Sequence, residues 1–99
     1  MRKGRPKKFR IMPREPAIKQ FSPRGRRGRP GYTGLKFEEF EALRLSDYMG
    51  LNQIESAKRM RISQQTFSRV LKNARKSIAE ALVLGHIIKV NGGVHKIEQ

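Results

Sequence analysis

The residue types between Ser63 and Lys76 suit contacts with nucleic-acid bases and phosphates. A glutamine amide pairs with adenine at N6 and N7, and an arginine guanidinium pairs with guanine at O6 and N7. The candidates for base contacts are Gln64, Gln65, Thr66, Ser68 and Arg69, and the candidates for phosphate contacts are Arg61, Lys72, Asn73, Arg75 and Lys76. Every charged residue between Glu55 and Glu80 is Lys or Arg, whereas an ordinary solvated helix face mixes both signs.

Two predicted helices position these residues. Asn52 suits an N-cap, with Glu55 three residues later, and it predicts a short helix over residues 53–60. Ser63 is the next N-cap, and apolar residues spaced by three and four predict a long helix over 64–84, closed by Gly85. Two such helices across a tight turn, with the small Ala57 allowing close approach, predict a helix-turn-helix whose second helix enters the major groove of duplex DNA.

The flanking segments complete the expected fold. Apolar residues near helical spacing predict a first helix over 37–48, ended by Gly50. The acids Glu38, Glu39 and Glu41 lie near its start, where the helix dipole explains them without a metal ion. β-branched residues on both sides of Asn91-Gly92 predict a β-hairpin over 86–99. The expected fold is therefore mainly α: a three-helix helix-turn-helix domain over 35–85 with a long third helix, a C-terminal β-hairpin and an extended basic N-terminal arm.

Residues 1–34 form the expected arm, with twelve Lys/Arg and one acid against a net charge of +15 for the whole chain. Five prolines interrupt any helical register, and the few apolar residues follow no sustained period, which favours an extended or disordered segment. Lys3-Gly4-Arg5-Pro6 and Arg27-Gly28-Arg29-Pro30 resemble the core of AT-hook motifs, which follow a narrow minor groove. The arm candidates for minor-groove or phosphate contacts are Lys3, Arg5, Lys7, Lys8, Arg27 and Arg29. A tail that only confers solubility is the alternative.

Composition argues against several other classes of protein. The chain has no cysteine, so disulfides and cysteine-ligated zinc are excluded. His86 and His95 have no nucleophile or acid nearby in a catalytic pattern, so we expect no enzyme, no cofactor and no metal. The basic N-terminus lacks the apolar run of a signal peptide, and no stretch is apolar for long enough to span a bilayer. We therefore expect a cytoplasmic, nucleoid-associated protein without a membrane partner.

The run from Lys36 to Gln53, the run from Ser63 to Lys76 and the segment Ala79–Gly85 resemble a small prokaryotic family of uncharacterised, predicted DNA-binding proteins. That family is catalogued as a domain of unknown function, and its helix-turn-helix resembles region 4 of sigma-70 factors. The resemblance implies transcription-related binding of double-stranded DNA. The sequence departs from the family pattern in two places: Arg61 stands where the inter-helix turn usually has Gly, and Phe9 and Met12 occupy a part of the arm where many relatives carry cysteines.

Three alternatives remain open at the level of sequence. A basic, Gly/Arg-rich arm suits RNA as well as DNA, so an RNA-binding or ribosome-associated protein is one. A protein-interaction module of the transcription machinery that contacts RNA polymerase is another. The third concerns assembly, because Ile78, Leu82 and Val83 exceed what one small core would cover and so favour a homodimer over a monomer.

Overall fold

The computed structural model describes residues 9–25, 27–93 and 95–97. Its helices are α1 (Phe37–Leu43), which continues into the π-helical turn η1 (Arg44–Tyr48), α2 (Gln53–Met60) and α3 (Gln64–Leu84). Its strands are β1 (Arg10–Met12), β2 (Gln20–Phe21), β3 (Tyr32–Leu35), β4 (Ile87–Val90) and β5 (His95–Ile97). The expectation of three helices is confirmed, and a small sheet accompanies them. No helix within the described ranges is long and apolar enough to cross a membrane.

Local sequence explains where α2 and α3 begin and end. The side chain of Asn52 accepts a hydrogen bond from the Glu55 N–H at 2.8 Å, and the Ser63 hydroxyl accepts one from the Thr66 N–H at 3.1 Å. Each bond satisfies an N–H that the first helical turn leaves unpaired. Gly85 ends α3 in the left-handed conformation at φ 65°, as glycine does without steric cost.

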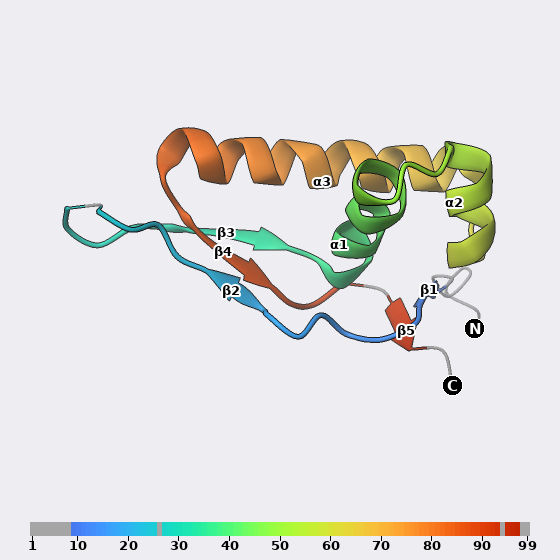
Figure 1. The fold of residues 1–99 in the computed structure, drawn as a ribbon, viewed down its shortest axis with the longest axis horizontal. Helices are drawn as coiled ribbons and strands as arrows, with labels where there is room; N and C mark the ends of the chain where they lie inside the picture. The colour runs from blue at the N-terminus through green and yellow to red at the C-terminus, as the bar shows by residue number, and fades with distance from the viewer. Residues whose placement is uncertain (1–8, 26, 94, 98–99) are drawn as a thin grey trace, which may run out of the picture.

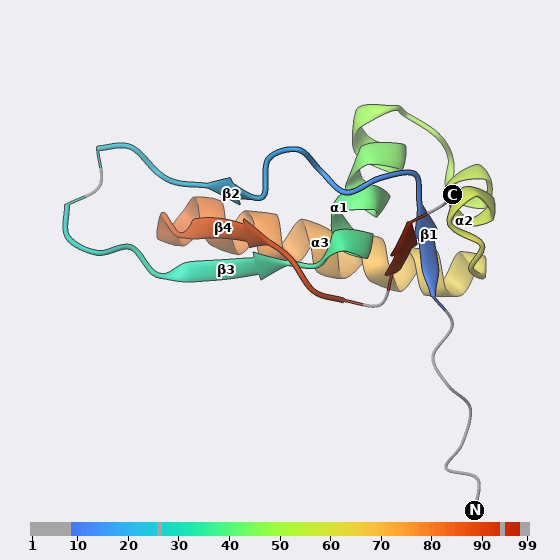
Figure 2. The same cartoon turned by 90° about the horizontal axis from the view of Figure 1, so that it is seen from below.

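The strands form two small sheets that join distant parts of the chain. β4 lies between β2, to which it is antiparallel, and β3, to which it is parallel, while β1 and β5 form a separate parallel pair. Figure 1 shows α3 along the top of the molecule, with α1 and the larger sheet packed beneath it. From below, the sheet covers the C-terminal half of α3, and β1 and β5 lie near α2 and the N-terminal half (Figure 2).

Two hydrophobic clusters hold these layers together. The first joins the helices through Ala42, Leu45, Ala57, Met60, Phe67, Val70 and Leu71. The second joins α1 and α3 to the strands through Met12, Leu35, Phe37, Ala74 and Val90. Because α3 contributes to both clusters, it is the element around which the fold is built.

The predicted β-hairpin over 86–99 is wrong. Within the described ranges β4 pairs with β2 and β3, and β5 pairs with β1. The Asn91-Gly92 pair does not fold β4 back on itself: the Asn91 N–H donates to the Leu35 carbonyl at 3.0 Å, and the Phe37 N–H donates to the Gly92 carbonyl at 3.2 Å. The chain therefore continues beside residues 35–37 and passes the start of α1.

The prediction that residues 1–34 form a separate arm is also wrong for much of that segment. Met12 is fully buried in the second hydrophobic cluster, and β1, β2 and most of β3 lie within this range. Isolated apolar residues without periodicity gave no sign of this, because Ile11, Met12 and Phe21 lie opposite Lys96, Ile97 and Ile88, far along the chain. Residues 1–8, including the candidates Lys3, Arg5, Lys7 and Lys8, lie outside the described ranges.

Candidate nucleic-acid interface

The connection between α2 and α3 is a single tight turn. Arg61 adopts the left-handed conformation at φ 56° and ψ 45°, and it is the one non-glycine residue with positive φ within the described ranges. The Ile62 N–H donates to the Ala57 carbonyl at 3.1 Å, which closes the end of α2. Ala57, Met60 and Phe67 are buried between the two helices, and Figure 1 shows α2 crossing the N-terminal end of α3 steeply.

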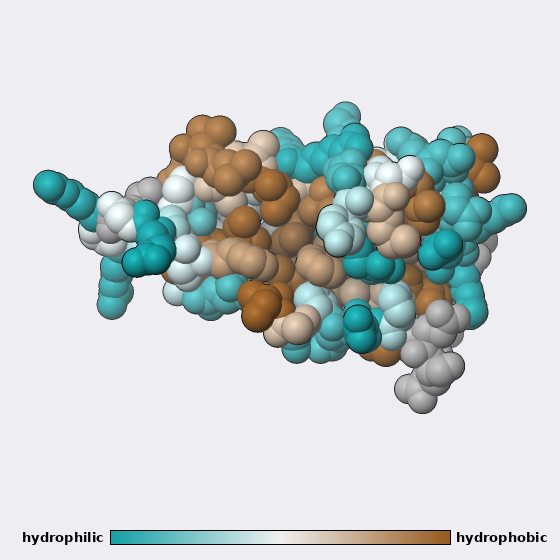
Figure 3. Space-filling model, in the orientation of Figure 1, coloured by the Kyte–Doolittle hydropathy of each residue, from teal (hydrophilic) through white to brown (hydrophobic). Residues whose placement is uncertain are grey.

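The outward side of α3 carries a stripe of polar and basic residues, which we call the α3 stripe. Its members are Gln65, Arg69, Lys72 and Lys76, all exposed and spaced by four, three and four residues. That spacing places them on one face, opposite the buried Phe67, Val70, Leu71 and Ala74. α3 carries four Lys/Arg and a single acid, Glu80. Figure 3 shows hydrophilic side chains along the edge of the molecule formed by the first half of α3.

The remaining candidates flank the α3 stripe. Gln64, Ser68 and Arg75 are exposed on the side of α3 toward η1, and Asn73 is exposed on the side toward β1. Thr66 is half-buried, and its hydroxyl accepts a 2.9 Å hydrogen bond from Ser63, so it is partly used in the N-cap. The structure therefore places Gln65 and Arg69 on the face of α3 opposite its buried residues, with the other candidates of α3 on either side.

Arg75 already has a partner in the protein. Its guanidinium donates two hydrogen bonds to the carboxylate of Asp47, at 3.1 and 2.7 Å. These hydrogen bonds hold the pKa of Asp47 below its ordinary value. Since both side chains are about half exposed, solvent screens the pair and a phosphate could compete for Arg75.

Arg10 is a neighbour of the α3 stripe that the sequence did not single out. Arg10 of β1 and two residues of α3, Arg69 and Asn73, line a hollow of about 180 Å³. Its other side includes Lys36, the N-cap of α1, and Glu39 in the first turn of that helix. Because β1 precedes α1 by more than twenty residues, only the fold brings Arg10 beside Arg69. The signal available in the sequence was that Arg10 extends the basic run of residues 1–8.

The second Arg-Gly-Arg-Pro motif lies far from the start of α3. Arg27 and Arg29 are exposed in the loop between β2 and β3, at the end of the molecule next to the C-terminus of α3 (Figures 1 and 2). The first copy precedes β1, which packs near α2 and the start of α3. Since the strands on either side of the second motif pair with β4, that motif is part of the fold and not of a free arm.

His86 has a structural environment. Its Nδ1 lies 2.9 Å from the hydroxyl of the buried Thr33, and that hydroxyl donates to Glu80 at 3.1 Å. The three residues tie β3 to the last turns of α3 and to the loop before β4. The acids of α1 are likewise engaged, since Glu39 accepts from the Lys36 N–H and Glu41 pairs with Arg44 at 2.8 Å.

The fold and this surface define a small, strongly basic protein of three helices and a small sheet. Residues 1–98 match the family described as "Protein of unknown function DUF134", and the chain belongs to that family. Its relatives carry the name UPF0251 protein. One, from Methanococcus maripaludis, is 44% identical over 99 residues, which cover 99% of this chain and 76% of the relative.

Two bacterial relatives extend the comparison beyond archaea. A UPF0251 protein from Chlorobaculum tepidum is 43% identical over 97 residues, which cover 96% of this chain and 49% of the relative. Another, from Caldicellulosiruptor saccharolyticus, is 49% identical over 78 residues, 79% of this chain and 55% of the relative. No solved structure matches the chain.

Proposed function

We propose that the protein is a DNA-binding transcriptional regulator in which α2, the turn at Arg61 and α3 act as a helix-turn-helix. The observation that carries the proposal is the α3 stripe. The amide of Gln65 and the guanidinium of Arg69 can form hydrogen bonds with base edges, and the two lysines can neutralise phosphates. All four side chains are exposed on α3, which packs into both hydrophobic clusters.

The roles of the stripe residues follow from their order along α3. Gln65 and Arg69 lie in the first two turns, where a recognition helix contacts bases in the major groove. Lys72 and Lys76 lie one and two turns further on, where the groove wall brings the phosphates close. Arg10, which lines the same hollow as Arg69, adds a phosphate contact from β1.

The loop between β2 and β3 has a separate role in this proposal. Arg27 and Arg29 are about 30 Å from the start of α3, given the length of a 21-residue helix. They reach flanking DNA, in a minor groove or along the phosphates, and not the site read by Gln65 and Arg69.

The proposal is tested by titrating a labelled duplex with the full chain and competing it with structured RNA of equal length. Duplex DNA should compete better than the RNA, and Arg69→Ala should lower affinity for a preferred duplex more than for an unrelated one. Arg24→Ala, which removes one positive charge from the distant loop, is the matched control and should lower both affinities alike. Preferential binding of the RNA would contradict the proposal and favour an RNA-binding protein.

A further inference from the structure

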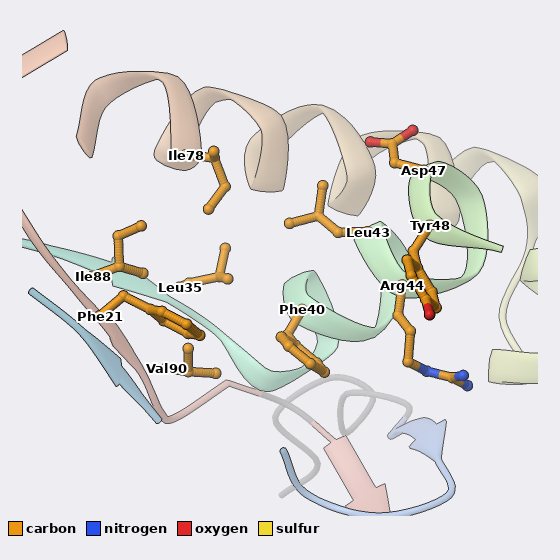
Figure 4. Close-up of a pocket in the computed structure, with 10 residues that line it drawn as sticks. All are labelled: Phe21, Leu35, Phe40, Leu43, Arg44, Asp47, Tyr48, Ile78, Ile88 and Val90. Atoms are coloured by element: carbon orange, nitrogen blue, oxygen red, sulfur yellow. The ribbon is translucent and has the colours of Figure 1, made fainter. Parts of the chain in front are cut away.

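An apolar groove opens on the face of the molecule away from the α3 stripe. It has a volume of about 730 Å³ and lies between α1, η1, the second half of α3 and strands β2 and β4 (Figure 4). Its walls are the side chains of Phe21, Leu35, Phe40, Leu43, Ile78 and Ile88. Figure 3 shows the same region as a hollow of hydrophobic surface in the middle of this face.

The charges at the rim of the groove are balanced. Arg44 is paired with Glu41 at 2.8 Å, and Asp47 is paired with Arg75 at 2.7 Å. Each pair carries no net charge, so the rim adds little to the net charge of +15 of the chain. Its chemistry suits an apolar, uncharged surface.

Leu82 projects from α3 beside the groove. It follows Ile78 by four residues and Arg75 by seven, so it lies on the same side of the helix, one turn beyond the groove wall. Its side chain is 74% exposed although it is large and apolar. Val83, which is 81% exposed, lies on a different side of α3, in line with Lys72 and Lys76.

We infer that this face binds a second copy of the chain, with Leu82 of each protomer inserted into the groove of the other. A twofold interface requires one surface that carries both a projection and the recess that receives it. Here the two are neighbours on a single face, so a twofold axis between them satisfies both at once. No foreign partner is needed to explain why a recess and an unpaired apolar projection occur together.

Other large, exposed side chains line the groove beside Leu82. Besides Leu82, the large side chains of Phe21 and Tyr48 are 51% and 86% exposed. Both side chains line the groove, so exposed apolar surface continues from its walls to its rim. Single apolar residues on a surface need no explanation, but a grouped set beside a recess is typical of an interface.

The inference goes beyond the proposed function, because it holds with or without nucleic acid. Leu82 is thirteen residues from Arg69, a separation of about 20 Å along the helix. The proposed interface and the base-contacting end of the α3 stripe are therefore separate parts of α3.

Sedimentation equilibrium of the full chain, without nucleic acid, tests the inference at micromolar to hundred-micromolar concentrations. The wild-type protein should reach twice the protomer mass of 11.4 kDa. Leu82→Glu should raise the dissociation constant of the dimer by about tenfold or more, equivalent to about 1.4 kcal/mol. Val83→Glu introduces the same charge one residue away on an equally exposed side chain and should leave the mass unchanged.

A monomeric mass at every concentration would overturn the inference, as would equal effects of the two glutamates. Such a result would leave a small apolar ligand or a foreign protein as the occupant of the groove. Raising the salt concentration distinguishes this association from DNA binding, because screening should strengthen contact between two positive protomers and weaken contact with phosphate.

A cross-linking measurement checks which residues meet. Because the chain has no cysteine, one substitution per chain gives unambiguous disulfides. We expect a mixed disulfide on mild oxidation when the Leu82→Cys variant is combined with a tagged Phe21→Cys variant. Val83→Cys in place of Leu82→Cys should form much less, and equal yields from the two pairs would contradict the interface.

Discussion

Arg61 is the residue at which backbone conformation and side-chain chemistry conflict most clearly. The turn between α2 and α3 requires a left-handed residue, and a side chain with a Cβ pays about 1 kcal/mol for that conformation. The family resemblance led us to expect glycine here, and the φ of 56° explains why glycine suits the position. The presence of arginine in this unfavourable conformation is consistent with the proposed contact between its guanidinium and a phosphate.

Replacing Arg61 should therefore move stability and DNA affinity in opposite directions. Arg61→Gly should raise the free energy of unfolding by about 0.5–1 kcal/mol, because it relieves the left-handed strain. It should also weaken DNA binding and reduce the salt dependence by about one contact. Urea denaturation and titrations at several salt concentrations measure the two effects. Arg61→Ala, which removes the charge but keeps a Cβ, should weaken binding without the gain in stability.

Asp47 holds the side chain of Arg75, which we propose to contact a DNA phosphate. Asp47→Asn should tighten binding to duplex DNA by severalfold, because it frees Arg75 and removes a negative charge near the α3 stripe. Fluorescence anisotropy with one duplex at low and physiological salt measures the change. Affinity that stays the same would mean that Arg75 does not reach the DNA.

The same ion pair gives a small pH dependence of stability. The folded pKa of Asp47 is lowered, mainly by its hydrogen bonds from Arg75, so the pair contributes fully above the unfolded pKa of about 3.9. The contribution is lost as the pH falls through the lower folded pKa. Because both groups are about half exposed, Asp47→Asn should cost less than about 1 kcal/mol at pH 7. Denaturation of both proteins at neutral pH and again below the folded pKa should show a difference only at neutral pH.

At the scale of elements, the helices could be predicted from the sequence and the strands could not. The signals for α2 and α3 are local: Asn52 and Ser63 are N-caps, Gly85 ends the third helix, and apolar residues recur at helical spacing between them. The partners of β4 are distant, with Gln20 opposite Lys89 and Tyr32 opposite Ile87. Pairing across such distances depends on the whole fold, so an Asn-Gly pair beside an apolar run was taken for a local turn.

In the candidate interface, too, features set by local sequence could be predicted and features set by tertiary packing could not. The α3 stripe could be predicted, because helical periodicity alone separates Gln65 and Arg69 from the buried Phe67. Arg10 and the Asp47–Arg75 pair could not, because each depends on how β1 or η1 packs against α3. The groove could not be predicted either, since its walls come from six elements spread over the chain.

Within α2, Ser56 presents a polar group that the fold does not satisfy. Its side chain is fully buried, and its hydroxyl has no hydrogen-bond partner. Ser56→Ala should therefore raise the free energy of unfolding by up to about 1 kcal/mol, through relief of the desolvated hydroxyl and better helix propensity. DNA affinity should not change, because the residue is not exposed. A loss of stability in urea denaturation would show that the hydroxyl is bonded.

At the scale of the whole molecule, the N-terminal third has two roles that the charge pattern alone could not separate. Residues 10–35 supply β1, β2, β3 and the buried Met12, so they are part of the fold. Residues 1–8 precede β1 and carry five Lys/Arg. Deletion of residues 1–34, the obvious test of a free arm, would therefore remove strands and confuse loss of binding with loss of structure.

Deletion of residues 1–8 alone should keep the fold and weaken binding. Far-UV circular dichroism and the unfolding midpoint should stay close to those of the full chain. Because each phosphate contact contributes about 0.9 to the salt slope, loss of up to five contacts should flatten the slope by as much as about 4.5. An unchanged slope would mean that these residues do not touch the DNA. Deletion of residues 1–34, in contrast, should abolish the cooperative unfolding transition.

The central claim is that the α3 stripe reads base sequence in duplex DNA. Selection of bound duplexes from random DNA, at low and at physiological salt, tests it most directly. We expect an enriched sequence motif, with stronger base preferences at the higher salt concentration. The same selection with the Arg69→Ala variant should give a motif that has lost its base preference at one or two positions. Retention of DNA without any motif, or the same motif from both proteins, would contradict it.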